Sequence, residues 1–196
     1  MKNILNKNLF LTKEHIWIFK AANNYDILDP QTAKCILECR EPNLSFFTKM
    51  LRFSKYKHFT PFDFHISNTT GETLVQAKKS WTFLRVTVDV LDSSSELIGY
   101  LQRPIFSLRP KLTVLDTRMN KVGEMSGSFL GWKFTFTYKG EEQAQVSKKW
   151  AGLGKELFTS ADNYMLTIND SVKADQPSRG LIFASILCID MLFKEK

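Results

Sequence analysis

The sequence predicts a mainly β, α+β domain in which a meandering antiparallel sheet or barrel surrounds one apolar C-terminal helix. Two observations carry this prediction. Short runs of alternating apolar and polar residues recur along the chain between turns rich in Asn, Asp, Gly and Ser, which is typical of half-buried antiparallel strands. The last long run, from Gly180 to Phe193, is apolar on nearly every side, as expected of a helix that is buried all round.

The strands are expected between turn signals along the chain. The clearest runs are 62–67, 84–90, 111–115 and 132–138, followed by turns at 68–71, 92–95, 116–120 and Gly140. Residues 150–162 instead carry apolar side chains at three- and four-residue spacing. That spacing predicts a short amphipathic helix, which Gly152 and Gly154 weaken.

The C-terminal run could cross a membrane or fill the barrel, and its length favours the second alternative. About 14 residues make a helix of roughly 21 Å, whereas the hydrocarbon layer is roughly 30 Å thick. Asp190 is the one charge in the run, and a carboxylate at depth in a bilayer costs about 2.5–3.5 kcal/mol. We expect Asp190 to be hydrogen-bonded inside the barrel or at the helix end; a part in moving lipid headgroups is the alternative.

Composition limits the functions to consider. The chain has 196 residues and a formal charge of +7, which suits one domain and a polyanionic partner such as anionic lipid or nucleic acid. No RNA-binding signature accompanies the charge, so nucleic acid is disfavoured. The three cysteines, Cys35, Cys39 and Cys188, do not form a disulfide framework and suit a reducing compartment. Without a long apolar N-terminal region, we expect a cytoplasmic protein.

One segment combines basic and aromatic residues in a way that suits a membrane interface. Residues 46–59 interleave five Phe and Tyr residues and His58 with four cations, and these cations are Lys49, Arg52, Lys55 and Lys57. Cations near an anionic leaflet are worth about 1 kcal/mol each, and aromatic rings favour the interface. The alternative is a loop or strand whose aromatic side chains pack into the barrel.

Residues 146–152 and 155–164 (VSKKWAG and KELFTSADNY) closely resemble a signature block of the phospholipid scramblase family. The apolar helix with its Asp190, and residues 23–27 and 98–100, are also similar to that family. The resemblance runs from about Phe19 to Glu195. It implies a closed antiparallel Tubby-like barrel of about twelve strands around a central helix at about 179–194. It also implies a single domain from 19 to 196 after an N-terminal lead-in of residues 1–18.

The family resemblance also implies a calcium-responsive loop, here residues 160–171. Calcium requires six to eight oxygen ligands, several of them from carboxylates. Only Asp162 and Asp170 are acidic in this segment, whose first and last residues are serines. The alternation of Tyr164, Leu166 and Ile168 favours an ordinary strand instead. Calcium as a cofactor is therefore doubtful, and no other cofactor is indicated.

Two functions remain after this reading of the sequence. The first is a membrane-associated scramblase that moves phospholipids in both directions between leaflets without covalent chemistry. The second is a non-enzymatic scaffold or signalling module that binds phosphoinositides or other anionic lipids and acts through a protein partner. Nucleophile elbows, phosphate-binding loops and zinc-protease motifs are absent from the sequence, so an enzyme is not expected. We expect peripheral or weak anchorage at the cytoplasmic face of an anionic membrane.

Overall fold

The computed structural model describes residues 6–14, 24–43, 45–52, 60–81, 85–106, 109–130, 132–148 and 163–193. The strands are β1 (Leu9–Glu14), β2 (Tyr25–Leu28), β3 (Cys35–Arg40), β4 (Phe62–Asn68), β5 (Thr73–Lys79), β6 (Thr87–Asp92), β7 (Leu97–Gln102), β8 (Lys111–Leu115), β9 (Lys121–Ser128), β10 (Lys133–Tyr138), β11 (Glu141–Ser147) and β12 (Asn163–Ile168). The helices are α2 (Phe46–Arg52) and α3 (Pro177–Phe193).

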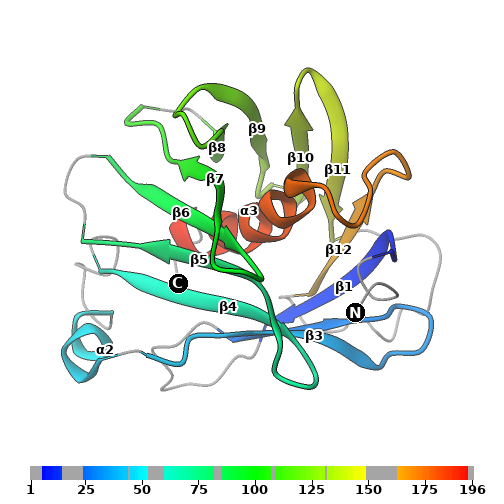
Figure 1. Cartoon of the computed structure of the whole chain (residues 1–196), viewed down its shortest axis with the longest axis horizontal. Coiled ribbons are helices and arrows are strands. Elements are labelled where there is room, and N and C mark those ends of the chain that lie inside the picture. Colours follow the sequence, from blue (N-terminus) through cyan, green and yellow to red (C-terminus); the bar gives the residue numbers. More distant parts are fainter. Residues whose placement is uncertain are drawn as a thin grey trace.

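All twelve strands form one closed antiparallel barrel in which each strand pairs with its neighbours in the sequence (Figure 1). The first and last strands close it, with Leu11 opposite Met165 in the β1–β12 pair. Along most strands the inward residues are apolar and fully buried, and the outward residues are partly exposed. The expected Tubby-like arrangement of a closed twelve-stranded barrel is therefore confirmed.

Helix α3 fills the barrel, as its length and composition predicted (Figure 1). It contacts strands β5 to β8 most closely, and Phe183 on its surface meets Phe10 of β1 edge to face with ring centroids 5.1 Å apart. Thirteen of its 17 residues are buried. Among the residues that the structure describes, no helix combines the length and the apolarity needed to cross a membrane.

The alternating strand directions sort the connections into two ends of the barrel. Six connections, β1–β2, β3–β4, β5–β6, β7–β8, β9–β10 and β11–β12, lie at one end, which we call the loop end. The turns β2–β3, β4–β5, β6–β7, β8–β9 and β10–β11 and the β12–α3 connection lie at the other, which we call the hairpin end. Helix α3 therefore starts at the hairpin end and finishes at the loop end.

The hairpin end consists of tight turns that the sequence specifies well. Between β10 and β11, Lys139 and Gly140 both have positive φ angles, 51° and 83°, which is the two-residue turn whose twist matches antiparallel strands. Asp92 and Asp116 each accept backbone N–H bonds within their own turns, for example from Ser94 at 2.8 Å and Arg118 at 2.9 Å. These connections are short and polar.

Two expectations about the fold need correction. Strand β1 lies within residues 1–18, which were expected to precede the domain, yet it pairs with both β2 and β12; the barrel therefore begins before residue 19. A loop or strand was one alternative for the segment that starts at Phe46, but 46–52 form helix α2. Ser45 caps this helix, since its Oγ accepts the Thr48 N–H at 3.2 Å. The helix expected at 150–162 lies outside the described residues.

Candidate functional site at the loop end of the barrel

At the loop end, the last turn of α3 is fixed to the barrel wall by polar contacts. The Tyr25 hydroxyl on β2 donates a hydrogen bond to Asp190 Oδ2 at 2.7 Å, and both side chains are buried. Arg103, just after β7, donates from Nη1 to the Leu192 carbonyl at 3.1 Å and lies 4.6 Å from the centroid of the Phe193 ring. Asp190 thus has the hydrogen-bonded position inside the barrel that its place in the sequence predicted.

Burial shifts the pKa values of the groups around the Tyr25–Asp190 hydrogen bond. Desolvation, followed by the nearby charge of Asp190, raises the pKa of Tyr25 well above its ordinary value of 10.0, so the hydroxyl stays protonated and donates. Desolvation likewise raises the pKa of Cys39 on β3 well above 9.0 and that of Cys188 on α3. The interior thiols are therefore neutral and poorly reactive at physiological pH.

The opposite end of α3 is held by Arg179, which the sequence analysis did not single out. Its side chain is buried, and Nη1 donates to the Val172 carbonyl at 2.8 Å and to Asn8 Oδ1 at 3.2 Å. Nη2 donates to the Lys7 carbonyl. The guanidinium thereby joins the start of α3 to the residues that precede β1. We regard Arg179 as a structural residue that fixes the helix in register with the barrel.

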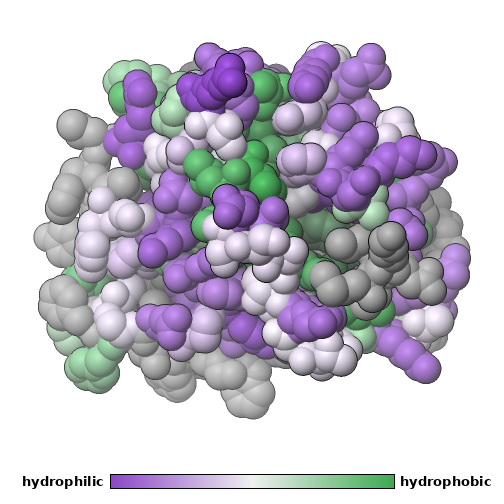
Figure 2. Space-filling view, viewed as in Figure 1, coloured by the Kyte–Doolittle hydropathy of each residue, from purple (hydrophilic) through white to green (hydrophobic). Residues whose placement is uncertain are grey.

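The loop end also presents large apolar side chains to solvent. Seven such side chains are exposed among the described residues, and they are Phe46, Met50, Trp81, Ile105, Phe106, Met119 and Leu130. Six of them belong to the loop end: α2 lies in the β3–β4 connection, and the other four lie in the β5–β6, β7–β8 and β9–β10 connections. Met119 alone lies in a turn of the hairpin end. In Figure 2, apolar side chains over α2 form a pale green patch at the lower left.

The two ends also differ in the composition of their connecting segments. Counted from the sequence, the six loop-end segments contain 11 Lys and Arg, 3 Asp and Glu, and 14 aromatic residues. The six hairpin-end segments contain 4 Lys and Arg, 6 Asp and Glu, and no aromatic residue. Among the residues that the structure describes, the loop-end segments contain six of these Lys and Arg and one carboxylate, so the two ends also differ in charge within the described part of the chain.

Aromatic side chains and cations also pair at this end. Lys148 Nζ, just after β11, lies 4.3 Å from the centroid of the Trp132 ring, which itself stacks on Tyr164 at 5.5 Å. Arg103 lies over Phe193 in the same manner. Such pairs place a positive charge over the face of an aromatic ring, where the two attract each other.

The structure places the predicted lipid-binding residues only in part. Lys49 and Arg52 belong to α2, at the loop end, whereas Lys55 and Lys57 lie outside the described residues. Phe46 on the same helix is exposed and does not pack into the barrel, contrary to the loop-or-strand alternative. The other exposed apolar positions were not predicted, because they are spread over three separate connections of the chain. In an antiparallel barrel every second connection lies at the same end, so assigning the connections to the two ends would have grouped these positions.

The expected calcium loop at 160–171 is interrupted by a strand. Residues 163–168 form β12, paired with β1 and β11, as the alternation of Tyr164, Leu166 and Ile168 predicted. Asp170 follows this strand at the hairpin end and accepts a hydrogen bond from Asn8 Nδ2 at 2.6 Å. Asp162 lies outside the described residues. The backbone of this segment is thus extended over half of the proposed loop.

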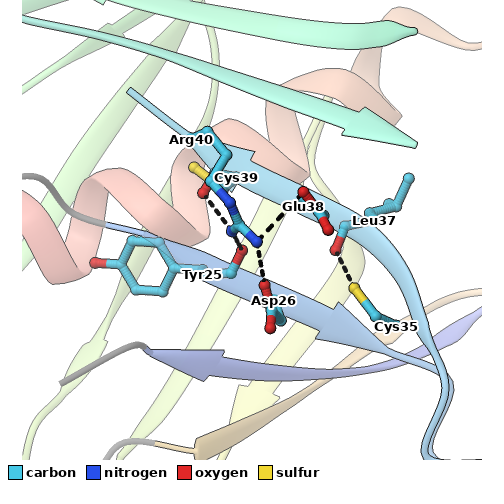
Figure 3. A network of polar contacts seen from close by, with 7 residues as sticks. All are labelled: Tyr25, Asp26, Cys35, Leu37, Glu38, Cys39 and Arg40. Carbon is cyan, nitrogen blue, oxygen red and sulfur yellow. Dashed lines mark hydrogen bonds and ion pairs between the residues drawn. The ribbon is translucent and has the colours of Figure 1, made fainter. Parts of the chain in front are cut away.

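A second cluster of metal-type ligands lies on the outer face of β2 and β3 (Figure 3). Ligand atoms of Asp26, Cys35 and Glu38 come within 4.8 Å of one another. The guanidinium of Arg40 already pairs with both carboxylates, at 2.6 Å to Asp26 and 3.3 Å to Glu38. Desolvation and the two carboxylates raise the pKa of the Cys35 thiol. The arrangement is an ion-pair cluster that fastens β2 to β3.

Comparison with known proteins agrees with the fold and with the resemblance in the sequence. A family model described as Scramblase matches residues 5–196. The yeast protein "Altered inheritance rate of mitochondria protein 25" of Saccharomyces cerevisiae is 24% identical over 173 residues, which cover 76% of this chain and 52% of the relative. The chain thus spans about half the length of that relative. No solved structure matches. Because the family model covers nearly the whole chain, the protein belongs to the scramblase family.

Proposed function

We propose that the protein binds anionic phospholipid membranes peripherally, at their cytoplasmic face, through the loop end of the barrel and without covalent chemistry. The observation that supports this most is the charge difference between the two ends among the described residues, with 6 Lys and Arg and 1 carboxylate in the loop-end connections and 4 Lys and Arg and 6 carboxylates in the hairpin-end connections. Each cation near an anionic surface contributes about 1 kcal/mol. Five simultaneous contacts would then favour binding by roughly 10³- to 10⁴-fold.

Binding, rather than transport by the barrel interior, is the function that the packing favours. The inner wall is lined with fully buried side chains, and α3 occupies the centre. The polar groups near the loop end are engaged in holding the helix, as Tyr25 and Asp190 are. A headgroup path through the barrel would require α3 to leave, which would expose the whole apolar core to water.

Vesicle flotation tests this proposal. The protein should float with vesicles that contain phosphatidylserine or a phosphoinositide, remain unbound with phosphatidylcholine alone, and dissociate as salt screens the charges. Arg85→Glu with Lys133→Glu, at the loop end, should weaken binding by 10-fold or more. Lys34→Glu with Lys173→Glu changes the net charge equally at the hairpin end and should leave binding within about twofold. Equal losses in both variants would contradict the proposal.

Bidirectional movement of phospholipids between leaflets is the second candidate, and family membership is the observation that favours it. The same vesicles can carry a fluorescent lipid whose exposure on the outer leaflet is followed with and without calcium. Exchange at far fewer protein molecules than lipids would support transport by this chain. Binding without exchange would leave a membrane-binding module that acts through a partner protein.

A further inference from the structure

We infer that the loop end does more than attract an anionic surface: the exposed apolar side chains of its connections enter the acyl region, and the barrel stands on the membrane with its hairpin end toward water. This inference rests on the proposed function and specifies how the protein is oriented. Phe106 and Leu130 are 92% and 96% exposed, and Phe46 on α2 is 82% exposed. The transfer free energy from water to hydrocarbon is most favourable for large apolar side chains that are almost fully exposed to water.

These three residues come from different connections that are spread around about half of the rim of the barrel. Phe46 lies between β3 and β4, Phe106 between β7 and β8, and Leu130 between β9 and β10. Since the strand order in the barrel follows the sequence from β3 to β10, the side chains are distributed along an arc of one rim. Separate points along a rim suit a flat, deformable surface better than they suit a single bound peptide, which needs a continuous groove.

The charges in the same connections identify the surface as phospholipid rather than a second copy of the chain. Arg85 and Arg109 are exposed next to the apolar positions, whereas Glu41, the one carboxylate that the structure describes in these connections, is buried. Two such rims brought face to face would place cations against cations. An anionic bilayer satisfies both kinds of side chain, because headgroup phosphates lie directly above the acyl chains.

The hairpin end provides the internal comparison. Its connections contain more acidic than basic residues and no aromatic residue, so an anionic surface repels it. Met119, in the β8–β9 turn, is the one large apolar side chain exposed there in the described part of the chain, at 49%. The attraction of the loop end and the repulsion of the hairpin end therefore favour the same orientation of the barrel on the membrane.

Site-specific fluorescence on vesicles tests the orientation. In a Cys35→Ser background, Phe106→Cys, Leu130→Cys and Met119→Cys are each labelled with an environment-sensitive dye and mixed with phosphatidylserine vesicles carrying a quencher on the acyl chains. For dyes at positions 106 and 130, the emission maximum should shift to shorter wavelength and the fluorescence should be quenched. The dye at position 119 should show neither change. Each protein is floated in parallel, so that binding and orientation are measured on the same sample.

The outcomes separate the two proposals. Flotation together with quenching at 119, or at none of the three positions, would overturn the orientation and leave the proposed function standing. Failure to float with any vesicle would overturn both. As a label-free check, Phe106→Ser with Leu130→Ser should weaken partitioning by about 100-fold, roughly tenfold for each side chain, while Met119→Ser stays within twofold. Unchanged partitioning, or a wild-type dimer that these changes convert to a monomer, would contradict insertion.

Discussion

Tyr25→Phe tests whether α3 is anchored inside the barrel as described. The change removes only the hydroxyl that donates to Asp190 at 2.7 Å, and the ring, which is fully buried, stays in place. A hydrogen bond to a charged acceptor contributes about 1.5–3 kcal/mol, and losing it leaves a buried carboxylate with one donor fewer. We therefore expect the free energy of unfolding to fall by about 2 kcal/mol, which lowers Tm by about 4–8 °C in a chain of this size.

Urea denaturation followed by circular dichroism measures this loss directly. Tyr100→Phe is the matched control, because Tyr100 on β7 is only partly buried and faces outward, and it should change stability by less than about 0.5 kcal/mol. A double-mutant cycle with Asp190→Asn should show coupling, since the two side chains share one bond. A Tyr25→Phe protein as stable as the wild type, or a cycle without coupling, would refute the anchored helix.

Two further predictions follow from burial and backbone packing. Desolvation holds the pKa values of Tyr25, Cys39 and Cys188 above their ordinary values, so the folded protein keeps protons that the unfolded chain releases above about pH 9. The free energy of unfolding should therefore fall as pH rises beyond 9, by up to about 1.4 kcal/mol per pH unit for each group; an unchanged urea midpoint between pH 8 and pH 10.5 would contradict this. Gly123→Ala should strongly lower Tm, because the new Cβ would collide with the Thr137 carbonyl oxygen of the paired strand. In Gly180→Ala the new Cβ meets the flexible end of Ile98 at 2.7 Å, and alanine favours the helix, so stability should change by less than about 1 kcal/mol.

The sequence predicted the elements in which one face is buried and the other is not. The run from Trp132 to Tyr138 alternates cleanly, and β10 has this alternation of buried and exposed residues. The apolar run before Phe193 predicted α3, and its length correctly indicated a buried helix. Burial imposes a period of two on β10 and a continuous apolar run on α3, and both patterns are readable without knowledge of the elements that pack against them.

The elements that were missed lack such a period. Strand β1 has three consecutive buried residues, Phe10 to Thr12, because Leu11 on its outer face is buried as well as the residues that line the barrel. Strand β9 contains Gly123 and Gly127, where the neighbouring backbone is so close that no side chain fits. Neither pattern resembles an isolated half-buried strand, so only the closed barrel explains them.

The loop-end surface could not be predicted residue by residue for a related reason. Phe106 and Leu130 are far from Phe46 in the sequence, and each lies in a different, short connection. They belong together only because the strand order brings alternate connections to the same end. The basic and aromatic segment at 46–59 was the one local signal, and its described part, α2, lies at the same end of the barrel as Phe106 and Leu130.

Thiol labelling of vesicle-bound protein is the most direct test of the account that the protein works on membranes with α3 still inside the barrel. Cys39 lies on the inner wall and is fully buried, whereas Cys35 is partly exposed on the outside. A water-soluble maleimide followed by mass spectrometry should modify Cys35 and spare Cys39 to the same extent with and without vesicles. If vesicle binding instead exposes Cys39 at a rate approaching that of the unfolded chain, then the helix leaves the barrel on the membrane and the account is wrong.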